Sequence, residues 1–130
     1  MSLTGAQAMV SAALARAAEL NIRISVAVLD SSGDLRAFAR MDGAPPFTAE
    51  VAQSKAYGVL FTGRTSAELR EMANSRPPFF DAIKNLGRRT LVPSPGGIGI
   101  PGGGAIGISG AADPDQDVDV AQAAIKAAGD

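Results

Sequence analysis

Residues 96–110 read GGIGIPGGGAIGISG, and eight of these fifteen residues are glycine. The isoleucines of Ile98–Ile100 and Ile106–Ile108 recur every second residue, as in a strand that presents one face to a core. Between them, Pro101–Gly104 supplies the positive φ angles that a tight turn requires. The stretch therefore predicts a β-hairpin whose strands carry glycine because another backbone or a ligand comes close to them.

Gly97, Gly99 and Gly102 also match the G-x-G-x-x-G spacing of dinucleotide-binding proteins. That motif works when a strand enters a glycine turn that opens a helix, whose N-terminus holds the pyrophosphate. Here Pro101 and more glycines follow, and the next run is strand-like. We therefore reject a dinucleotide-binding interpretation.

The chain has 130 residues, which is enough for one hydrophobic core and too few for two, so we expect a single domain over residues 1–130. Twelve basic and thirteen acidic residues give a net charge of −1, and the basic residues form no cluster. This balance argues against a nucleic-acid or membrane-surface partner. No apolar run approaches about 18 residues and no basic leader segment is present, so we expect a soluble, cytoplasmic protein.

Cysteine and histidine are both absent from the sequence. The chain therefore lacks a disulfide, a thiolate nucleophile, an imidazole general base and a zinc site of the usual nitrogen and sulfur kind. We predict no metal site. Any catalysis must use carboxylates, lysine, arginine, tyrosine or hydroxyl groups.

Hydrophobic periodicity predicts the remaining elements. We expect helices near residues 5–20, 48–62, 65–74, 79–85 and 114–128, and strands near 22–28, 35–40 and 90–92 in addition to the hairpin. Helix caps are expected at Thr4, Thr48, Thr65 and Asp113, and a left-handed helix stop at Asn21. The order α-β-β-α-α-α-β-β-β-α predicts an α+β fold with a sheet of about five antiparallel strands packed with helices.

Lys55 is the charged residue inside the apolar stripe of the helix predicted at 48–62. Its stem could snorkel so that the ammonium reaches water. Alternatively, Lys55 is a partly buried cation that binds a carboxylate or works as an acid or base. In that case we expect it to face a cleft shared with Arg40 and the Gly96–Gly97 turn.

Arg40 suits a carboxylate through two hydrogen bonds, and the backbone amides of Gly96–Gly97 would add donors. Simpler alternatives are a solvated strand end for Arg40, a turn-forming role for Asp42 and a rim position for Tyr57 with its hydroxyl in water. The candidate ligand-binding residues are Arg40, Asp42, Lys55, Tyr57, Gly96 and Gly97. The candidate catalytic residues are Lys55 and Tyr57.

Several stretches together carry a family resemblance. They are SVAVLD at Ser25–Asp30 with Gly33, RMDGA at Arg40–Ala44, KAY at Lys55–Tyr57, PGG at Pro95–Gly97, GAIGISG at Gly104–Gly110 and DVDVA at Asp117–Ala121. In this order the chain resembles the haem-degrading-domain family (GlcG/HbpS-like) over nearly its whole length. The resemblance implies a profilin-like fold, a homo-oligomer between a dimer and an octamer, and haem binding in some members.

Two departures from that family bear on haem. The turn of the glycine hairpin is shorter here, and some haem-binding relatives ligate iron through histidine, which this chain lacks. The remaining iron ligands are Met41, Met72, Tyr57, a lysine or a weak hydroxyl such as Thr62. This set argues against a tight b-type haem site, so no cofactor is assigned.

Three functions stay open, and with them the question of whether the protein is an enzyme. The first is binding of a small molecule, either haem or another carboxylate-bearing ligand. The second is a cofactor-free lyase or isomerase acting on a small organic acid, with Lys55 or Tyr57 as acid or base and Arg40 as substrate anchor. The third is a ligand-free oligomeric accessory protein, because the alanine-rich first and last helices would allow close packing between copies.

Overall fold

The computed structural model describes residues 1–129, which form five helices and four strands. In chain order these are α1 (Leu3–Glu19), β1 (Ser25–Leu29), β2 (Leu35–Arg40), α2 (Phe47–Thr62), α3 (Ser66–Ser75), α4 (Pro77–Ile83), β3 (Gly97–Gly99), β4 (Ala105–Ser109) and α5 (Pro114–Gly129). The α+β class expected from the sequence is confirmed. No helix among these residues is long and apolar enough to span a bilayer.

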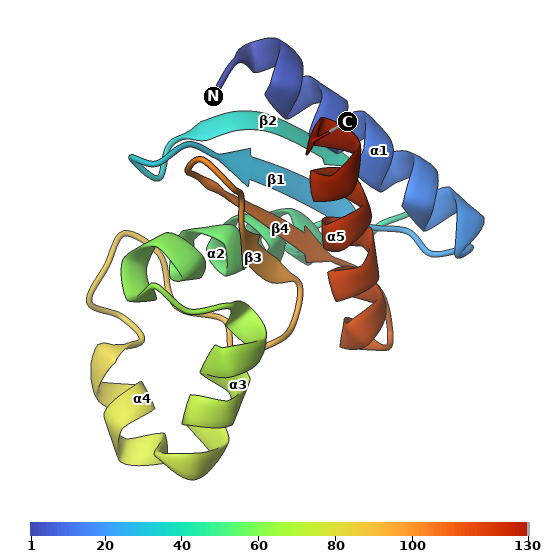
Figure 1. Ribbon diagram of the computed structural model, residues 1–130. Coiled ribbons are helices and arrows are strands. Elements are labelled where there is room, and N and C mark those ends of the chain that lie inside the picture. The colour runs from blue at the N-terminus through green and yellow to red at the C-terminus, as the bar shows by residue number, and fades with distance from the viewer. Residues whose placement is uncertain (130) are drawn as a thin grey trace.

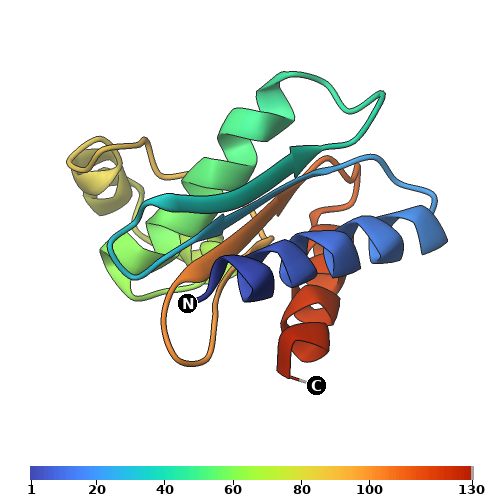
Figure 2. The same cartoon turned by 90° about the horizontal axis from the view of Figure 1, so that it is seen from above.

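The four strands form one antiparallel sheet in the order β2-β1-β4-β3. Helix α2 covers one face of this sheet, while α1 and α5 lie side by side on the other face (Figure 1, Figure 2). Helices α3 and α4 project away from the sheet (Figure 1) and connect α2 to β3. The result is a layered core with a helical extension at one end.

The alternation of side chains along the central strands produces two cores. Val26 of β1 pairs with Ile108 of β4, and both side chains are fully buried against α1 and α5. The next residues along each strand, Ala27 and Gly107, also pair, and they point toward α2. Because Ala27 and Gly107 are small, helix and sheet backbones approach closely at this pair.

The predicted glycine hairpin is confirmed as β3 and β4. Its turn is closed by a hydrogen bond from Ile100 N to Gly104 O of 3.0 Å. Gly102, Gly103 and Gly104 all have positive φ, as the turn requires. The close approach predicted for the strand glycines is also found, since a Cβ on Gly107 would overlap the carbonyl oxygen of Ala52 in α2.

The fifth strand expected at residues 90–92 does not form. Leu91 instead packs with Leu69 and Phe80 in a small separate core beneath α3 and α4. Its backbone N–H bonds to the carbonyl of Lys84 at 2.9 Å, which ties the segment to the end of α4 rather than to a strand. Alternation over three residues was too short to distinguish a strand from an extended connection.

Two of the predicted helix caps are also wrong. Helix α1 begins earlier than expected, because the Ser2 hydroxyl, not that of Thr4, accepts the Gly5 N–H at 3.0 Å. Thr48 lies inside α2, where its hydroxyl bonds to Pro45 O and Ser25 Oγ. The Thr65 capping box is confirmed.

Candidate functional site

Lys55 lies at the middle of α2 with only 2% of its surface exposed. Its ammonium donates hydrogen bonds to Ile108 O at 2.8 Å and to Asp117 Oδ2 at 3.1 Å. The snorkelling interpretation of Lys55 is therefore wrong. The second interpretation was closer, but the carboxylate that Lys55 meets belongs to the protein itself.

Asp117 reaches this ammonium from the first turn of α5. Its other carboxylate oxygen, Oδ1, accepts the backbone N–H of Ala111 at 3.1 Å. Burial raises the pKa of Asp117 and lowers the pKa of Lys55, and in each case the partner's charge opposes the effect of burial. The pair connects α2, the end of β4 and α5 through one buried contact.

Gly96 and Gly97 pass directly over this ion pair. A Cβ on Gly96 would come within 3.1 Å of Lys55 Nζ and 2.9 Å of Asp117 Cβ, so only glycine leaves room for the pair. The Gly97 N–H, expected as a ligand donor, already bonds to Ser66 Oγ at 2.7 Å. The structure thus brings Lys55, Gly96 and Gly97 together, with the amide of Gly97 engaged in holding α3.

A cleft of about 210 Å³ opens above the ion pair, and we refer to it as the Lys55 cleft. Its walls include Phe47, Val51, Lys55, Ser109, Pro114 and Asp117. It lies between α2, the end of β4 and the start of α5. Arg40 does not line it.

Arg40 and Asp42 are both exposed at the far edge of the sheet, where β2 ends. The only hydrogen bond of the Arg40 side chain within residues 1–129 is a long one, 3.4 Å, to Ala44 O. Asp42 precedes Gly43, whose φ of +83° marks the turn that the sequence suggested. These positions match the simpler alternatives, and a ligand-binding role for either residue stays a prediction.

Tyr57 is buried in the second core, with 7% of its surface exposed. Its hydroxyl accepts the Arg88 N–H at 2.9 Å, and its ring stacks on Phe61 at a centroid distance of 5.7 Å. The rim position with the hydroxyl in water is therefore wrong. The geometry gives Tyr57 a structural contact, and its catalytic role stays a prediction.

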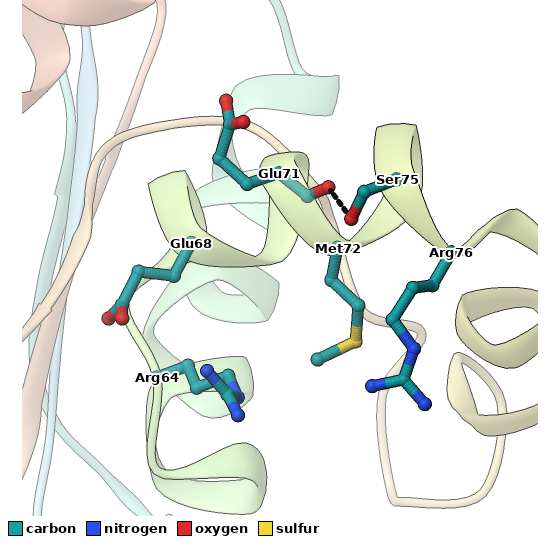
Figure 3. Close-up of a pocket in the computed structure, with 6 residues that line it drawn as sticks. All are labelled: Arg64, Glu68, Glu71, Met72, Ser75 and Arg76. Carbon is teal, nitrogen blue, oxygen red and sulfur yellow. Dashed lines mark hydrogen bonds between the residues drawn. The ribbon is translucent and has the colours of Figure 1, made fainter.

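A larger hollow lies where the end of α2 meets α3 and α4, and sequence reasoning missed it. Two adjoining cavities of about 270 and 330 Å³ share Arg64, Met72 and Arg76. We call this feature the α3 groove and define it by Phe61, Arg64, Met72, Arg76, Phe79 and Leu86. In Figure 3 the side chains of Met72 and Arg76 extend from α3 in the same direction, toward the side where Arg64 lies.

The α3 groove combines exposed apolar surface with positive charge. Phe61, Phe79 and Leu86 are 43%, 44% and 70% exposed. The Arg76 guanidinium lies 4.4 Å above the Phe79 ring. Within residues 1–129, neither Arg64 nor Arg76 forms an ion pair.

Two glutamates accompany these arginines on α3. Glu68 is held by the Thr65 capping box, whose hydrogen bonds lower its pKa, with a smaller contribution from the charge of Arg64. Glu71 points away from the Met72 side chain in Figure 3; its carboxylate forms no hydrogen bond or ion pair within residues 1–129, and its backbone oxygen accepts from Ser75 Oγ at 2.8 Å. The groove therefore contains two arginines and two glutamates, and none of the four forms an ion pair within residues 1–129.

A signal for this groove was present in the sequence. Arg64, Glu68, Met72 and Arg76 are spaced four apart; Glu68 and Met72 lie on one side of α3, and Arg64 and Arg76 flank its two ends. Among residues 1–129 no group of three or more acidic side chains is arranged to hold a metal ion.

A family model for haem-degrading HbpS-like proteins matches residues 1–126. The chain belongs to the HbpS-like family. This confirms the resemblance carried by its short motifs. A search of curated proteins gives no match.

Solved structures of related proteins share the fold. A haem complex of PduOC is 26% identical with a TM-score of 0.84, covering 98% of this chain and 94% of that one. A double mutant of Streptomyces reticuli HbpS is 26% identical with a TM-score of 0.81, covering 97% and 85%. Klebsiella pneumoniae protein ORFY has a TM-score of 0.88 over 99% and 90%, and at 24% identity it supports the fold alone.

In this HbpS-like chain the two hollows differ chemically. The Lys55 cleft has an internally neutralised ion pair at its floor, whereas the α3 groove offers aromatic surface and two arginines free of ion pairs within residues 1–129. Glu68 and Glu71 also line the α3 groove, so both hollows contain charges of both signs, but only the Lys55 cleft has them joined in a buried ion pair.

Proposed function

We propose that this HbpS-like protein binds a small, largely apolar molecule that carries carboxylates, and that it does so in the α3 groove. The observation that carries the proposal is the position of Arg64 and Arg76 on either side of Met72, beside exposed phenylalanine side chains. Surface arginines are ordinary, but two arginines beside exposed aromatic rings form an amphipathic receptor.

Haem is the ligand that fits this description best. It has a flat apolar ring and two propionates, and a haem complex is known for the related PduOC. Phe61 and Phe79 would contact the ring, and Arg64 and Arg76 would each pair with a propionate. Met72 lines the groove, and its thioether would ligate the iron in place of the histidine that the chain lacks.

The buried ion pair argues against placing the same ligand in the Lys55 cleft. Asp117 already neutralises Lys55, so an incoming carboxylate would have to displace it or accept a negative neighbour. A volume of about 210 Å³ is also too small for a porphyrin.

Titration with haem, followed by the Soret band, tests the proposal. We expect saturable binding to the wild type and a loss of affinity of about tenfold or more for Arg64→Gln/Arg76→Gln, because charge-assisted hydrogen bonds to the propionates are removed. Arg70→Gln is the matched control, since Arg70 is an exposed arginine of α3 outside the groove. Equal affinity in all three proteins would refute the assignment of the groove.

Met72→Leu separates iron ligation from ring binding. Leucine keeps the apolar volume and removes the thioether, so we expect the Soret band of bound haem to move while affinity for iron-free protoporphyrin stays close to that of the wild type. An unchanged haem spectrum would exclude Met72 as the ligand without excluding the groove.

A further inference from the structure

The Lys55 cleft contains hydrogen-bonding groups that the fold does not use. Ser109 ends β4 and lines the cleft, with only 4% of its surface exposed. Within residues 1–129 its hydroxyl forms no hydrogen bond, and no side-chain polar atom that is completely shielded from solvent lacks a partner. The Ser109 hydroxyl therefore faces the open cleft and is not hydrogen-bonded to another part of the protein.

Lys55 has hydrogen-bonding capacity at the same place. An ammonium carries three N–H groups, and two of them are engaged by Ile108 O and Asp117 Oδ2. The third has no partner within residues 1–129, and Lys55 lines the cleft beside Ser109. Two donors from different elements, α2 and β4, thus share one small cleft.

We propose that the Lys55 cleft is a second binding site, for a small neutral carbonyl compound such as an amide or ketone. The carbonyl oxygen accepts hydrogen bonds from Lys55 Nζ and Ser109 Oγ. The site is separate from the α3 groove, and the proposal does not rest on the function proposed for that groove.

The charges around the cleft favour a neutral ligand over an anion. Asp117 neutralises the only ammonium that lines the cleft, and Asp113 and Asp115 flank Pro114 at the start of α5. An anion in the cleft would meet a cation that is already paired, with the Asp117 carboxylate directly beside it. A carbonyl dipole uses the free N–H of Lys55 without this repulsion.

The walls set the size and polarity of the rest of the ligand. Phe47, Val51 and Pro114 form an apolar rim around the polar floor. The volume of about 210 Å³ corresponds to about seven water molecules at about 30 Å³ each, which is room for a compound of a few heavy atoms. A short aliphatic chain on the carbonyl group therefore fits against the rim.

Propanamide and propionate are a suitable pair of probes, because they have nearly the same shape and differ in charge. Each is titrated into ¹⁵N-labelled protein and followed by amide chemical shifts. We expect propanamide to shift the amides of Ser109, Gly110 and Ala111 in a saturable way, and propionate to bind about tenfold more weakly or not at all. Ser109→Ala should weaken propanamide binding by about tenfold, the effect of one lost hydrogen bond.

Ser11→Ala is the control, since Ser11 is an exposed serine of α1 away from the cleft, and it should bind propanamide like the wild type. Ser109→Ala removes one atom and keeps the ion pair, so a loss of binding would not result from unfolding. Three results would overturn the proposal: no saturable shift at these amides, equal binding of both probes, or unchanged binding by Ser109→Ala.

Discussion

Gly107 of β4 lies in direct contact with the carbonyl group of Ala52 in α2, with no side chain between helix and strand. The backbone nitrogen of Ala56 is also near, 2.8 Å from the position that a Cβ on Gly107 would occupy. The glycines of the hairpin thus determine how closely α2 approaches the sheet. This distance also places Lys55 within reach of Asp117.

Replacement of Gly107 by valine should therefore destabilise the fold more than Ile108→Val. A branched side chain at Gly107 collides with helix backbone that cannot rotate away, at a cost of about 1–3 kcal/mol or more. Ile108→Val removes one methylene group from the opposite core and should cost about 0.5–1.5 kcal/mol. Urea denaturation of both variants measures the difference, and equal midpoints would contradict the close contact.

The buried ion pair predicts strong coupling between its two members. Lys55→Met leaves the Asp117 carboxylate buried without its counter-ion, and we expect a cost of about 3–5 kcal/mol in unfolding free energy. The double variant Lys55→Met/Asp117→Leu should recover much of this loss, because no charge remains buried. A double-mutant cycle by chemical denaturation tests it, and additive effects would show that the two residues are not coupled.

Asp117 and Asp119, two residues apart on α5, should respond to pH in opposite directions. The bidentate contact with Arg16 lowers the pKa of Asp119, so its contribution to stability is present above its unfolded pKa and is lost as pH falls through the folded value. Burial raises the pKa of Asp117 above 3.8, its value in the unfolded chain. Its contribution to stability is therefore fully present below pH 3.8 and is lost as the pH rises through the pKa of Asp117 in the folded protein.

Carboxyl-detected NMR titration measures both groups directly. Asp119 should titrate below the range of an ordinary aspartate and Asp117 above it. In Arg16→Gln the pKa of Asp119 should return toward its ordinary value while that of Asp117 stays raised, because Arg16 contacts only Asp119 of the two. If the pKa values of both aspartates shifted in this variant, the cause would be the overall electrostatic field around α5 rather than the contact with Arg16.

Tyr57→Phe should destabilise the protein by about 1 kcal/mol, because the Arg88 N–H loses its acceptor while the ring packing is kept. Amide hydrogen exchange at Arg88 should rise in the same variant. If neither stability nor exchange changes, the hydroxyl contributes nothing to the fold and its contact is incidental.

The protein should form a homo-oligomer. Besides the groove residues, Phe47 is 63% exposed, Leu3 51% and Leu35 48%, which is apolar surface that one small chain leaves uncovered. Multi-angle light scattering should give a mass of at least twice that of the chain. A monomer at micromolar concentration would contradict this expectation.

Local patterns predicted the elements that depend on local causes. The hairpin, the Thr65 capping box and the left-handed Asn21, with φ of 55°, all follow from residues within a few positions of one another. The prediction of a strand at 90–92 was wrong because Leu91 packs against Leu69 and Phe80, which are distant in sequence. Short apolar runs do not show which partner they will meet.

The candidate site was harder to predict for the same reason. Periodicity marked Lys55 as unusual, and its burial followed, but nothing local indicated that Asp117 is its counter-ion 62 residues later. Arg40 and Asp42 are predicted to share a site with Lys55 because they are near it in sequence. The sheet order instead places them at the edge opposite to β3. The α3 groove needed the packing of three helices before its residues formed one surface.

The direct contact of α2 with Gly107 also affects whether ligand binding in the Lys55 cleft is coupled to ligand binding in the α3 groove. The Lys55 cleft lies along this helix, and Phe61 of the α3 groove lies near its end. Because the backbone of α2 touches the sheet backbone, the helix has no room to rotate or slide on the sheet. Ligand binding in one hollow therefore does not change the shape of the other. We therefore expect the two ligands to bind with a coupling free energy near zero, each as if the other were absent.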